Sequence, residues 1–250
     1  MPETGQNKFG EQDFWDKVAG QRVYAAFDDA EYADIFDRVL GADLSGESII
    51  DIGSASGVSA ALLAARGAKV LGVDISPELI RQAEQLWGDY EERLTFAVGD
   101  AENLDVPDQS VDVTFFGGVL HHFPEREKVF AEALRVTKPG GRFIAIEPNR
   151  RDFLELVEWR VAGWRGKLSP NEYPIDPYVM ASELSHAGFV AIDHWTTRHD
   201  IPVLAQMPRV GRLFRRNHGG WLKKPVLGAL NTLRPNDRQG TFFVASARRP

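Results

Sequence analysis

The sequence predicts an α/β fold, a doubly wound and mostly parallel sheet with helices on both faces. From Ser48 onward, short apolar runs rich in β-branched residues alternate with helix-like stretches, and such alternation implies right-handed crossovers between parallel strands. With 250 residues, 43% of them hydrophobic, the chain is long enough to bury the core of one large domain. We therefore expect a single domain over residues 1–250.

Seven apolar runs are expected to form the strands of one sheet. They are SIIDIG (48–53), KVLGVDIS (69–76), LTFAVGD (94–100), VDVTFFGG (111–118), RFIAIEP (142–148), FVAIDHWTT (189–197) and TFFVASARR (241–249). Helices are expected over 58–66, 77–87, 125–137 and 178–187. Ser76 and Pro77 mark the start of one of them, because serine is a favoured N-cap and proline is favoured at the first helical position.

Three segments fall outside this alternation of strands and helices. Two amphipathic helices are expected over 9–40, within an N-terminal part that spans residues 1–47. Insertions over 149–176 and 199–240 separate the core, residues 48–148, from its last helix and strands at 177–198 and 241–250. Ligands of open α/β sheets bind at the carboxyl ends of the strands, so we expect the insertions to form a helical lid there.

Composition excludes several classes of function. The chain has no cysteine, which rules out disulfides, thiolate zinc sites and iron–sulfur clusters. The net charge is −7, which argues against a generally basic nucleic-acid binder. The first residues, MPETGQNKFGEQDFWDK, are polar with no apolar h-region, and no later run is long and apolar enough for a membrane span, so a cytoplasmic location is predicted.

Residues 49–57, IIDIGSASG, end the first strand in an acid and then in small residues. Gly53, Ala55 and Gly57 lie two apart, so a ligand can approach the backbone closely. The spacing does not fit the dinucleotide pattern G-x-G-x-x-G, and no Lys-Ser or Lys-Thr pair follows to form a P-loop. The loop instead ends at the start of a helix, with Asp51 at the end of its strand.

Acidic residues also end the second and third strands. Asp74 is placed to accept hydrogen bonds from both hydroxyls of a ribose; the alternative is an acid that favours the start of the following helix. Asp100 can accept from the exocyclic amine of an adenine, and the amide of Ala101 can donate to a ring nitrogen. These positions indicate a nucleoside-containing ligand.

Four motifs in order resemble the class I S-adenosylmethionine-dependent methyltransferases, in their small-molecule, methyltransferase type 11-like branch. They are IIDIGSASG, VLGVDIS, VGDAENLDVPDQSVDVTFFGGVLHHF and EALRVTKPGGRFIAIEP, within residues 48–148. The resemblance implies a Rossmann-like, seven-stranded fold and S-adenosyl-L-methionine as cofactor. The expected cofactor-binding residues are Tyr24, Asp51, Gly53, Ser54, Ala55, Gly57, Asp74, Ile75, Asp100, Ala101, Glu102, Gly117 and Gly118. Ala55 departs from the glycine usual in the family.

The candidates for catalysis follow the fourth and fifth strands. A hydroxyl acceptor needs a base, and His121 or His122 can supply it, with His121 preferred; the alternative is a turn in which both histidines only cap backbone groups. Glu147 can bind the acceptor or be structural. Neither the histidines nor the carboxylates show metal-ligand spacing, so no metal is expected.

The predicted function is methyl transfer to a small-molecule acceptor in secondary or lipid-linked metabolism, with O-methylation favoured over N- or C-methylation. The alternatives are a non-methylating reaction such as a cyclisation, and a non-catalytic binding module. Tyr24 and the N-terminal helices are expected to close over the cofactor, unless their aromatic residues only pack the helices. The sequence leaves the oligomeric state open.

Residues 199–240 concentrate positive charge, with eight Lys or Arg against two acids. This basic segment can be a solvated helix on the sheet edge, a lid over an anionic acceptor, or a peripheral membrane contact for a lipid-linked one. Nucleic acid is not expected as a partner.

Overall fold

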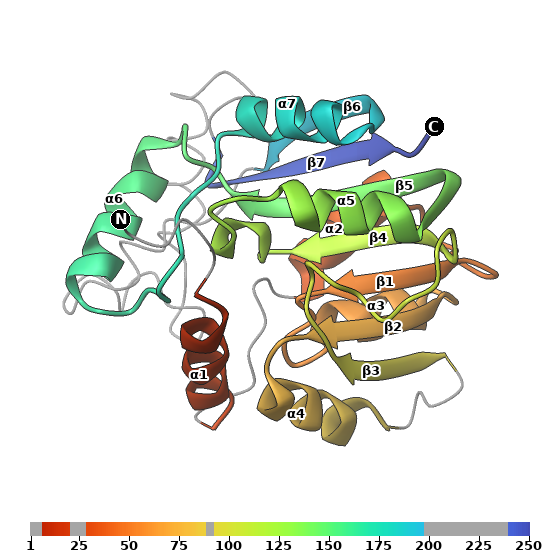
Figure 1. The fold of residues 1–250 in the computed structure, drawn as a ribbon, viewed down its shortest axis with the longest axis horizontal. Coiled ribbons are helices and arrows are strands. Elements are labelled where there is room, and N and C mark those ends of the chain that lie inside the picture. Colours follow the sequence, from red (N-terminus) through yellow and green to blue (C-terminus); the bar gives the residue numbers. More distant parts are fainter. Residues whose placement is uncertain (1–6, 21–28, 89–92, 198–239) are drawn as a thin grey trace, which may run out of the picture.

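The structure is a computed structural model that describes residues 7–20, 29–88, 93–197 and 240–250 (Figure 1). Helices α1 (Lys8–Ala19) and α2 (Asp29–Val39) precede the sheet, which confirms the two helices expected over 9–40. Figure 1 shows α1 and α6 (Phe153–Trp164) at the end of the sheet toward which the arrows of β1 and β4 point. The N-terminal helix therefore lies where the parallel strands end.

The sheet has seven strands in the order β3-β2-β1-β4-β5-β7-β6. Their bounds are β1 Ser48–Ile52, β2 Lys69–Asp74, β3 Leu94–Val98, β4 Val111–Gly117, β5 Thr137–Pro148, β6 Val190–Thr197 and β7 Phe242–Arg248. Strands β1 to β5 pair in parallel, and β7 runs antiparallel to both β5 and β6. The expected doubly wound, mostly parallel sheet is confirmed.

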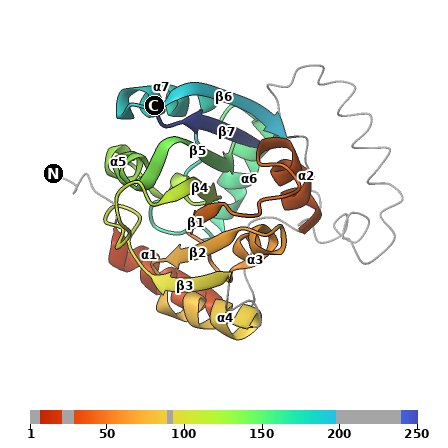
Figure 2. The ribbon, with the colours of Figure 1, turned by 90° about the vertical axis from the view of Figure 1, so that its right-hand side faces the viewer.

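The remaining helices cover the two faces of this sheet. They are α3 Val58–Ala65, α4 Pro77–Trp87, α5 Glu127–Val136 and α7 Pro177–Ala187, together with the short 3₁₀ helix η2 Leu120–His122. Figure 2 shows α2 and α3 on one face and α5 and α7 on the other. The strand order reverses between β1 and β4, and the crevice at such a reversal is where open α/β sheets bind ligands.

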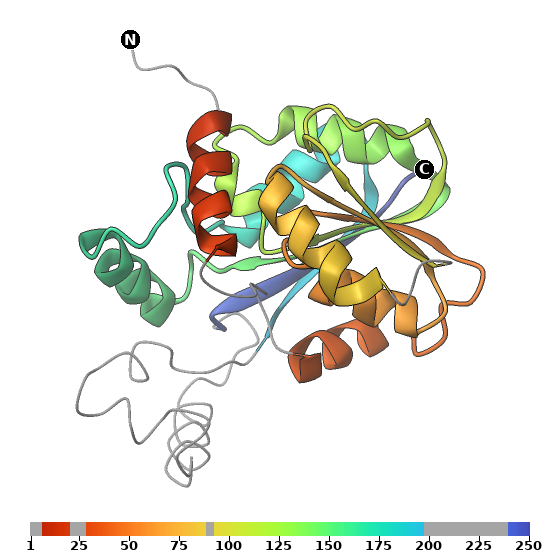
Figure 3. The same cartoon turned by 90° about the horizontal axis from the view of Figure 1, so that it is seen from below.

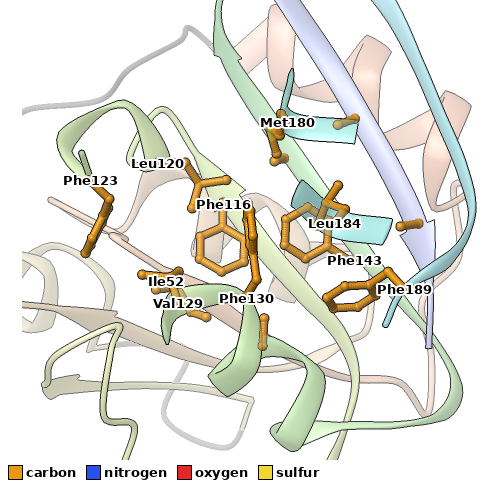
Figure 4. Packing of buried hydrophobic residues seen from close by; sticks show 14 of the residues in the cluster. Ile52, Phe116, Leu120, Phe123, Val129, Phe130, Phe143, Met180, Leu184 and Phe189 are labelled. Atoms are coloured by element: carbon orange, nitrogen blue, oxygen red, sulfur yellow. The ribbon is translucent and has the colours of Figure 1, made fainter. Parts of the chain in front are cut away.

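Aromatic side chains fill the core between the sheet and helices α5 and α7 (Figure 4). Phe143 of β5 lies 5.2 Å from Phe116 of β4 and 5.8 Å from Phe130 of α5, measured between ring centroids. All three side chains are buried. Strand β1 is buried on both faces from Ile49 to Ile52, as expected of a central parallel strand.

Helix α4 begins as its sequence predicts. The Ser76 hydroxyl accepts a hydrogen bond from the backbone N–H of Leu79 at 3.1 Å, and Pro77 occupies the first helical position. The same hydroxyl donates to the Asp16 carboxylate of α1. Ser76 therefore caps one helix and ties it to another.

Replacing Ser76 by alanine is expected to lower the free energy of unfolding by about 1–2 kcal/mol, since both the cap and the tether are lost. Urea denaturation of the variant and of the parent protein measures the difference. An unchanged midpoint at an unchanged slope would show that the cap contributes nothing.

The boundary between α5 and β5 differs from the expected one. The helix ends at Val136 and the strand begins at Thr137, so residues 138–141 extend the strand rather than only ending the helix. Thr137 is extended, pairs with Val111 of β4, and donates its hydroxyl proton to the carbonyl of Ala133 at 2.6 Å. Pairing with β4 thus decides the boundary, which local sequence cannot show.

Candidate functional site

A pocket opens at the carboxyl ends of β1 to β4 and holds about 820 Å³ of empty space, including its solvent-open mouth. Its floor is the loop after β1, and helices α1 and α2 contribute to its walls. The lining residues are Glu11, Trp15, Tyr32, Ile52, Gly53, Ser54, Ala55, Val58, Ser59, Val73, Asp74, Ile75, Leu79, Gly99, Asp100, Ala101, Gly117, Gly118, Val119, His122 and Phe123. Most are apolar or small, and the polar ones are acids, hydroxyls and one histidine.

The loop after β1 takes backbone conformations that place small residues against the pocket, while the N–H groups of Gly53 and Ser54 donate to the Val73 carbonyl. Gly53 has φ 75° and Gly57 has φ 79°, a region that glycine adopts at little cost. Ala55 also has positive φ, 48°, at the position where the sequence departs from glycine. Its backbone N–H donates to Asp74 Oδ2 at 2.9 Å, so the strained residue is held by the neighbouring strand.

Replacing Ala55 by glycine is expected to leave the stability within about 1 kcal/mol of the parent, and to raise rather than lower it. Removing the strain of an alanine in the left-handed region should stabilise the folded protein by about 1–2 kcal/mol. The greater conformational entropy of glycine in the unfolded chain should destabilise it by less, about 0.4–1 kcal/mol. Thermal unfolding measures the change, and a clear loss of stability would show that the Cβ of Ala55 makes a needed contact.

Asp74 ends β2 and faces the pocket. Its Oδ2 accepts from Ala55 N and its Oδ1 accepts from Ser76 N, both at 2.9 Å. Burial raises the pKa of its carboxyl group. Each carboxylate oxygen has a second lone pair, so the side chain can still accept from a ribose diol while it orders the loop.

Two buried polar atoms beneath the loop have no hydrogen-bond partner among the described residues, Asp51 Oδ1 and Ser54 Oγ. Asp51 is fully buried, accepts from Ser59 Oγ at 2.6 Å through its other oxygen, and has its pKa raised to about 7, chiefly by desolvation. Buried polar groups are normally satisfied. Ser54 lines the pocket whereas Asp51 lies behind it, so the Ser54 hydroxyl fits a ligand that brings polar groups to this loop, as the amino-acid part of S-adenosylmethionine would.

Asp100, after β3, is joined by a residue of α1. Lys8 Nζ lies 2.5 Å from Asp100 Oδ2 and 2.5 Å from Glu102 Oε2. Asp100 Oδ1 accepts from Glu102 N at 2.9 Å. Figure 3 shows α1 beside the start of α4, with α6 on its other side, so Lys8 fastens one end of this helix at the edge where an adenine would lie.

The two histidines after β4 have different surroundings. His122 lines the pocket, whereas His121 is buried behind it, with Nδ1 2.8 Å from Glu147 Oε2. The Glu147 carboxylate also accepts from the backbone N–H groups of Val119 and Leu120. Burial lowers the pKa of both histidines, that of His121 to about 3, and raises that of Glu147 to about 7. This geometry makes Glu147 the anchor of the turn and places His122, rather than the His121 preferred from the sequence, in the pocket wall.

His122 is held from two distant segments. Its Nδ1 lies 2.9 Å from Ser169 Oγ and 3.3 Å from Glu11 Oε2. Glu11, Ser169 and the pocket residue Trp15 were not predicted from the sequence as site residues. The one signal for Glu11 is its helical spacing with Trp15 and Val18, which puts a carboxylate on the apolar face of α1.

The expected site residues divide into three groups. Those in the pocket wall are Gly53, Ser54, Ala55, Asp74, Ile75, Asp100, Ala101, Gly117, Gly118 and His122. Those outside the wall that support it are Asp51, Gly57, Glu102, His121 and Glu147. Tyr24 and the basic segment up to residue 239 lie outside the described residues. Within the described ranges, His and acidic residues form no group that could hold a metal ion, and none of the helices is long and apolar enough to cross a membrane.

Comparison with known proteins places the chain in a family. Residues 50–145 match the model of a methyltransferase domain. The chain is 30% identical to a demethylmenaquinone methyltransferase of Symbiobacterium thermophilum, over 60% of this chain and 70% of that protein. It is 32% identical to the 27-O-demethylrifamycin SV methyltransferase of Amycolatopsis mediterranei, over 56% of each.

A solved structure shares the fold. The phosphoethanolamine N-methyltransferase 2 of Haemonchus contortus, in complex with S-adenosyl-L-methionine, superposes with a TM-score of 0.68 at 19% identity, over 96% of this chain and 57% of that one. The chain belongs to the S-adenosylmethionine-dependent methyltransferases. It is an enzyme of the class I, Rossmann-like type, and its cofactor is S-adenosylmethionine.

Proposed function

We propose that this enzyme methylates a hydroxyl oxygen of a small, largely apolar molecule, with His122 as the general base. The proposal rests on one observation, a histidine in the pocket wall whose ring is oriented by buried partners. When bound, S-adenosylmethionine supplies a methyl group activated by its sulfonium, and the electron pair of the broken carbon–sulfur bond leaves on sulfur. An amine can attack in its unprotonated form, but a hydroxyl must lose a proton, which is the step a base assists.

The residues around the pocket would bind different parts of the cofactor according to their positions. Asp74 would hold the ribose, Asp100 and Ala101 the adenine, and the loop over 53–55 with Gly117 and Gly118 the methionine part. This leaves the end of the pocket near His122 for the acceptor. His122 would take the hydroxyl proton as the new oxygen–carbon bond forms.

The apolar side chains near His122 support an apolar acceptor. Trp15, Val119 and Phe123 line the pocket beside it, and the ring of Trp15 meets that of His122 edge to face at 5.5 Å between centroids. Two relatives are named as methyltransferases of such compounds, a demethylmenaquinone and a 27-O-demethylrifamycin. An anionic or lipid-linked acceptor held by the basic segment stays a prediction, because that segment lies outside the described residues but for Gly240.

Product analysis tests the proposal. The enzyme would be incubated with S-adenosylmethionine labelled in its methyl group and with matched pairs of hydroxylated and aminated aromatic and aliphatic compounds. We expect labelled ethers and S-adenosylhomocysteine in equal amounts. Labelled amines alone would contradict O-methylation, and conversion of a compound with no labelled product would support a non-methylating reaction such as cyclisation.

A further inference from the structure

Helix α1 brings a carboxylate into the acceptor end of the pocket. Glu11 is only 2% exposed. Its Oε1 accepts from Ser169 Oγ at 3.0 Å and from Asn171 N at 2.9 Å, and its Oε2 accepts from Trp15 Nε1 at 3.3 Å. With the contact to His122, hydrogen bonds hold the pKa of Glu11 below its usual value despite burial. The carboxylate is therefore ionised and can only accept hydrogen bonds.

The direction of these hydrogen bonds fixes the tautomer of His122. A serine hydroxyl has one proton, and that of Ser169 goes to Glu11, which has none to give. Ser169 Oγ and Glu11 Oε2 are then both acceptors, and both lie within 3.3 Å of His122 Nδ1. His122 Nδ1 must therefore carry the proton, and the lone pair of the neutral ring resides on Nε2.

We propose that Glu11 and Ser169 are positioning residues that hold His122 in the tautomer whose Nε2 can accept a proton. The proposal rests on the proposed role of His122 as the base. It makes α1 part of the catalytic apparatus, because the carboxylate that sets the tautomer belongs to this helix and not to the core of the fold. Methyl transfer then requires that α1 be docked.

The charge of Glu11 should also favour the protonated form of His122. The other titratable groups that face the ring are Asp74 from β2, Glu147 from β5, Glu172 from the loop after α6, and His121. None of them changes in Glu11→Gln. The loss of one negative charge should therefore lower the pKa of His122, so the acidic limb of the activity profile should move to lower pH.

The matched control lies on the same helix. Asp13 is exposed, with 69% of its side chain accessible, and pairs only with Lys17 among the described contacts. Asp13→Asn removes one carboxylate from α1, as Glu11→Gln does, without touching the pocket. Melting temperatures of both variants show whether each one folds. If Glu11→Gln does not fold, Ser169→Ala tests the same tautomer by removing the other acceptor of the His122 Nδ1 proton.

Two measurements test the proposal. The first needs no acceptor: ¹⁵N imidazole spectra of the protein, with the His122 signals assigned from their loss in His122→Gln. We expect a proton on Nδ1 in the parent and in Asp13→Asn, and a shift toward the Nε2–H tautomer in Glu11→Gln. An unchanged tautomer and pKa of His122 in a folded Glu11→Gln protein would overturn the proposal.

The second measurement is kinetic. Glu11→Gln should lower kcat by about 10- to 100-fold, with S-adenosylmethionine affinity nearly unchanged and the acidic limb displaced. A loss of activity with an unmoved limb would indicate a structural role only and would overturn the positioning role. Full activity in His122→Gln would instead contradict the base itself, and the tautomer measured by NMR would still report on Glu11, so the two failures can be told apart.

Discussion

Replacing His122 by glutamine is expected to lower kcat on a hydroxyl acceptor by about 10²- to 10⁴-fold, the usual contribution of a general base. Glutamine retains a polar side chain but cannot accept a proton at neutral pH. Because the residues proposed to hold the cofactor do not include His122, the affinity for S-adenosylmethionine should change little. Steady-state kinetics and calorimetry on the same preparation measure both quantities.

His186 supplies the matched control for this change. It is an exposed histidine on α7 whose Nδ1 lies 2.7 Å from the carbonyl of Ser182 in its own helix. His186→Gln should keep full activity. A loss of less than tenfold in His122→Gln would return both histidines of the turn to a structural role.

Replacing Asp74 by alanine is expected to weaken S-adenosylmethionine binding by about 2–4 kcal/mol, the worth of two charge-assisted hydrogen bonds to a ribose. The structure adds a second cause of weakening, because Asp74 also accepts from Ala55 N and holds the loop after β1 in shape. Calorimetric titration with S-adenosylmethionine measures the effect.

Asp112 separates the loss of ribose contacts from a general loss of stability. It lies at the start of β4, accepts from the backbone N–H of Ser48 at 2.9 Å, and pairs with Lys138. Asp112→Ala thus also deprives a backbone N–H of its carboxylate, but far from the pocket, and should lower stability without changing cofactor affinity. Unchanged affinity in a folded Asp74→Ala protein would contradict its role as the ribose acceptor.

The parts of the fold that could be predicted are those that local sequence patterns determine. The apolar run of β1 predicts a strand because a central parallel strand is buried on both faces, and Ser76 with Pro77 predicts the start of α4 from capping alone. The junction of α5 and β5 could not be predicted, since pairing of Thr137 with β4 sets it. Helix and strand boundaries that tertiary contacts determine leave no pattern in the local sequence.

The site likewise has one part that local sequence predicts and another part that only tertiary contacts bring together. Asp74 and Asp100 could be found because Asp74 ends β2 and Asp100 comes just after β3, and parallel strands bring their carboxyl ends together. Glu11, His122 and Ser169 could not be found as a group, since Ser169 lies 47 residues from His122 and 158 from Glu11. The 3₁₀ turn over 120–122 determines which histidine meets the pocket, and sequence order does not reveal it.

The rescue of His122→Gln by an acceptor that is already ionised tests the proposed chemistry most directly. Two acceptors of matched shape would be compared, one with its hydroxyl neutral at the assay pH and one with it ionised. We expect the parent enzyme to exceed the variant by about 10²-fold or more on the neutral hydroxyl and by less than about tenfold on the ionised one, because only the first needs a base. Equal losses on both acceptors would contradict a proton-accepting role for His122.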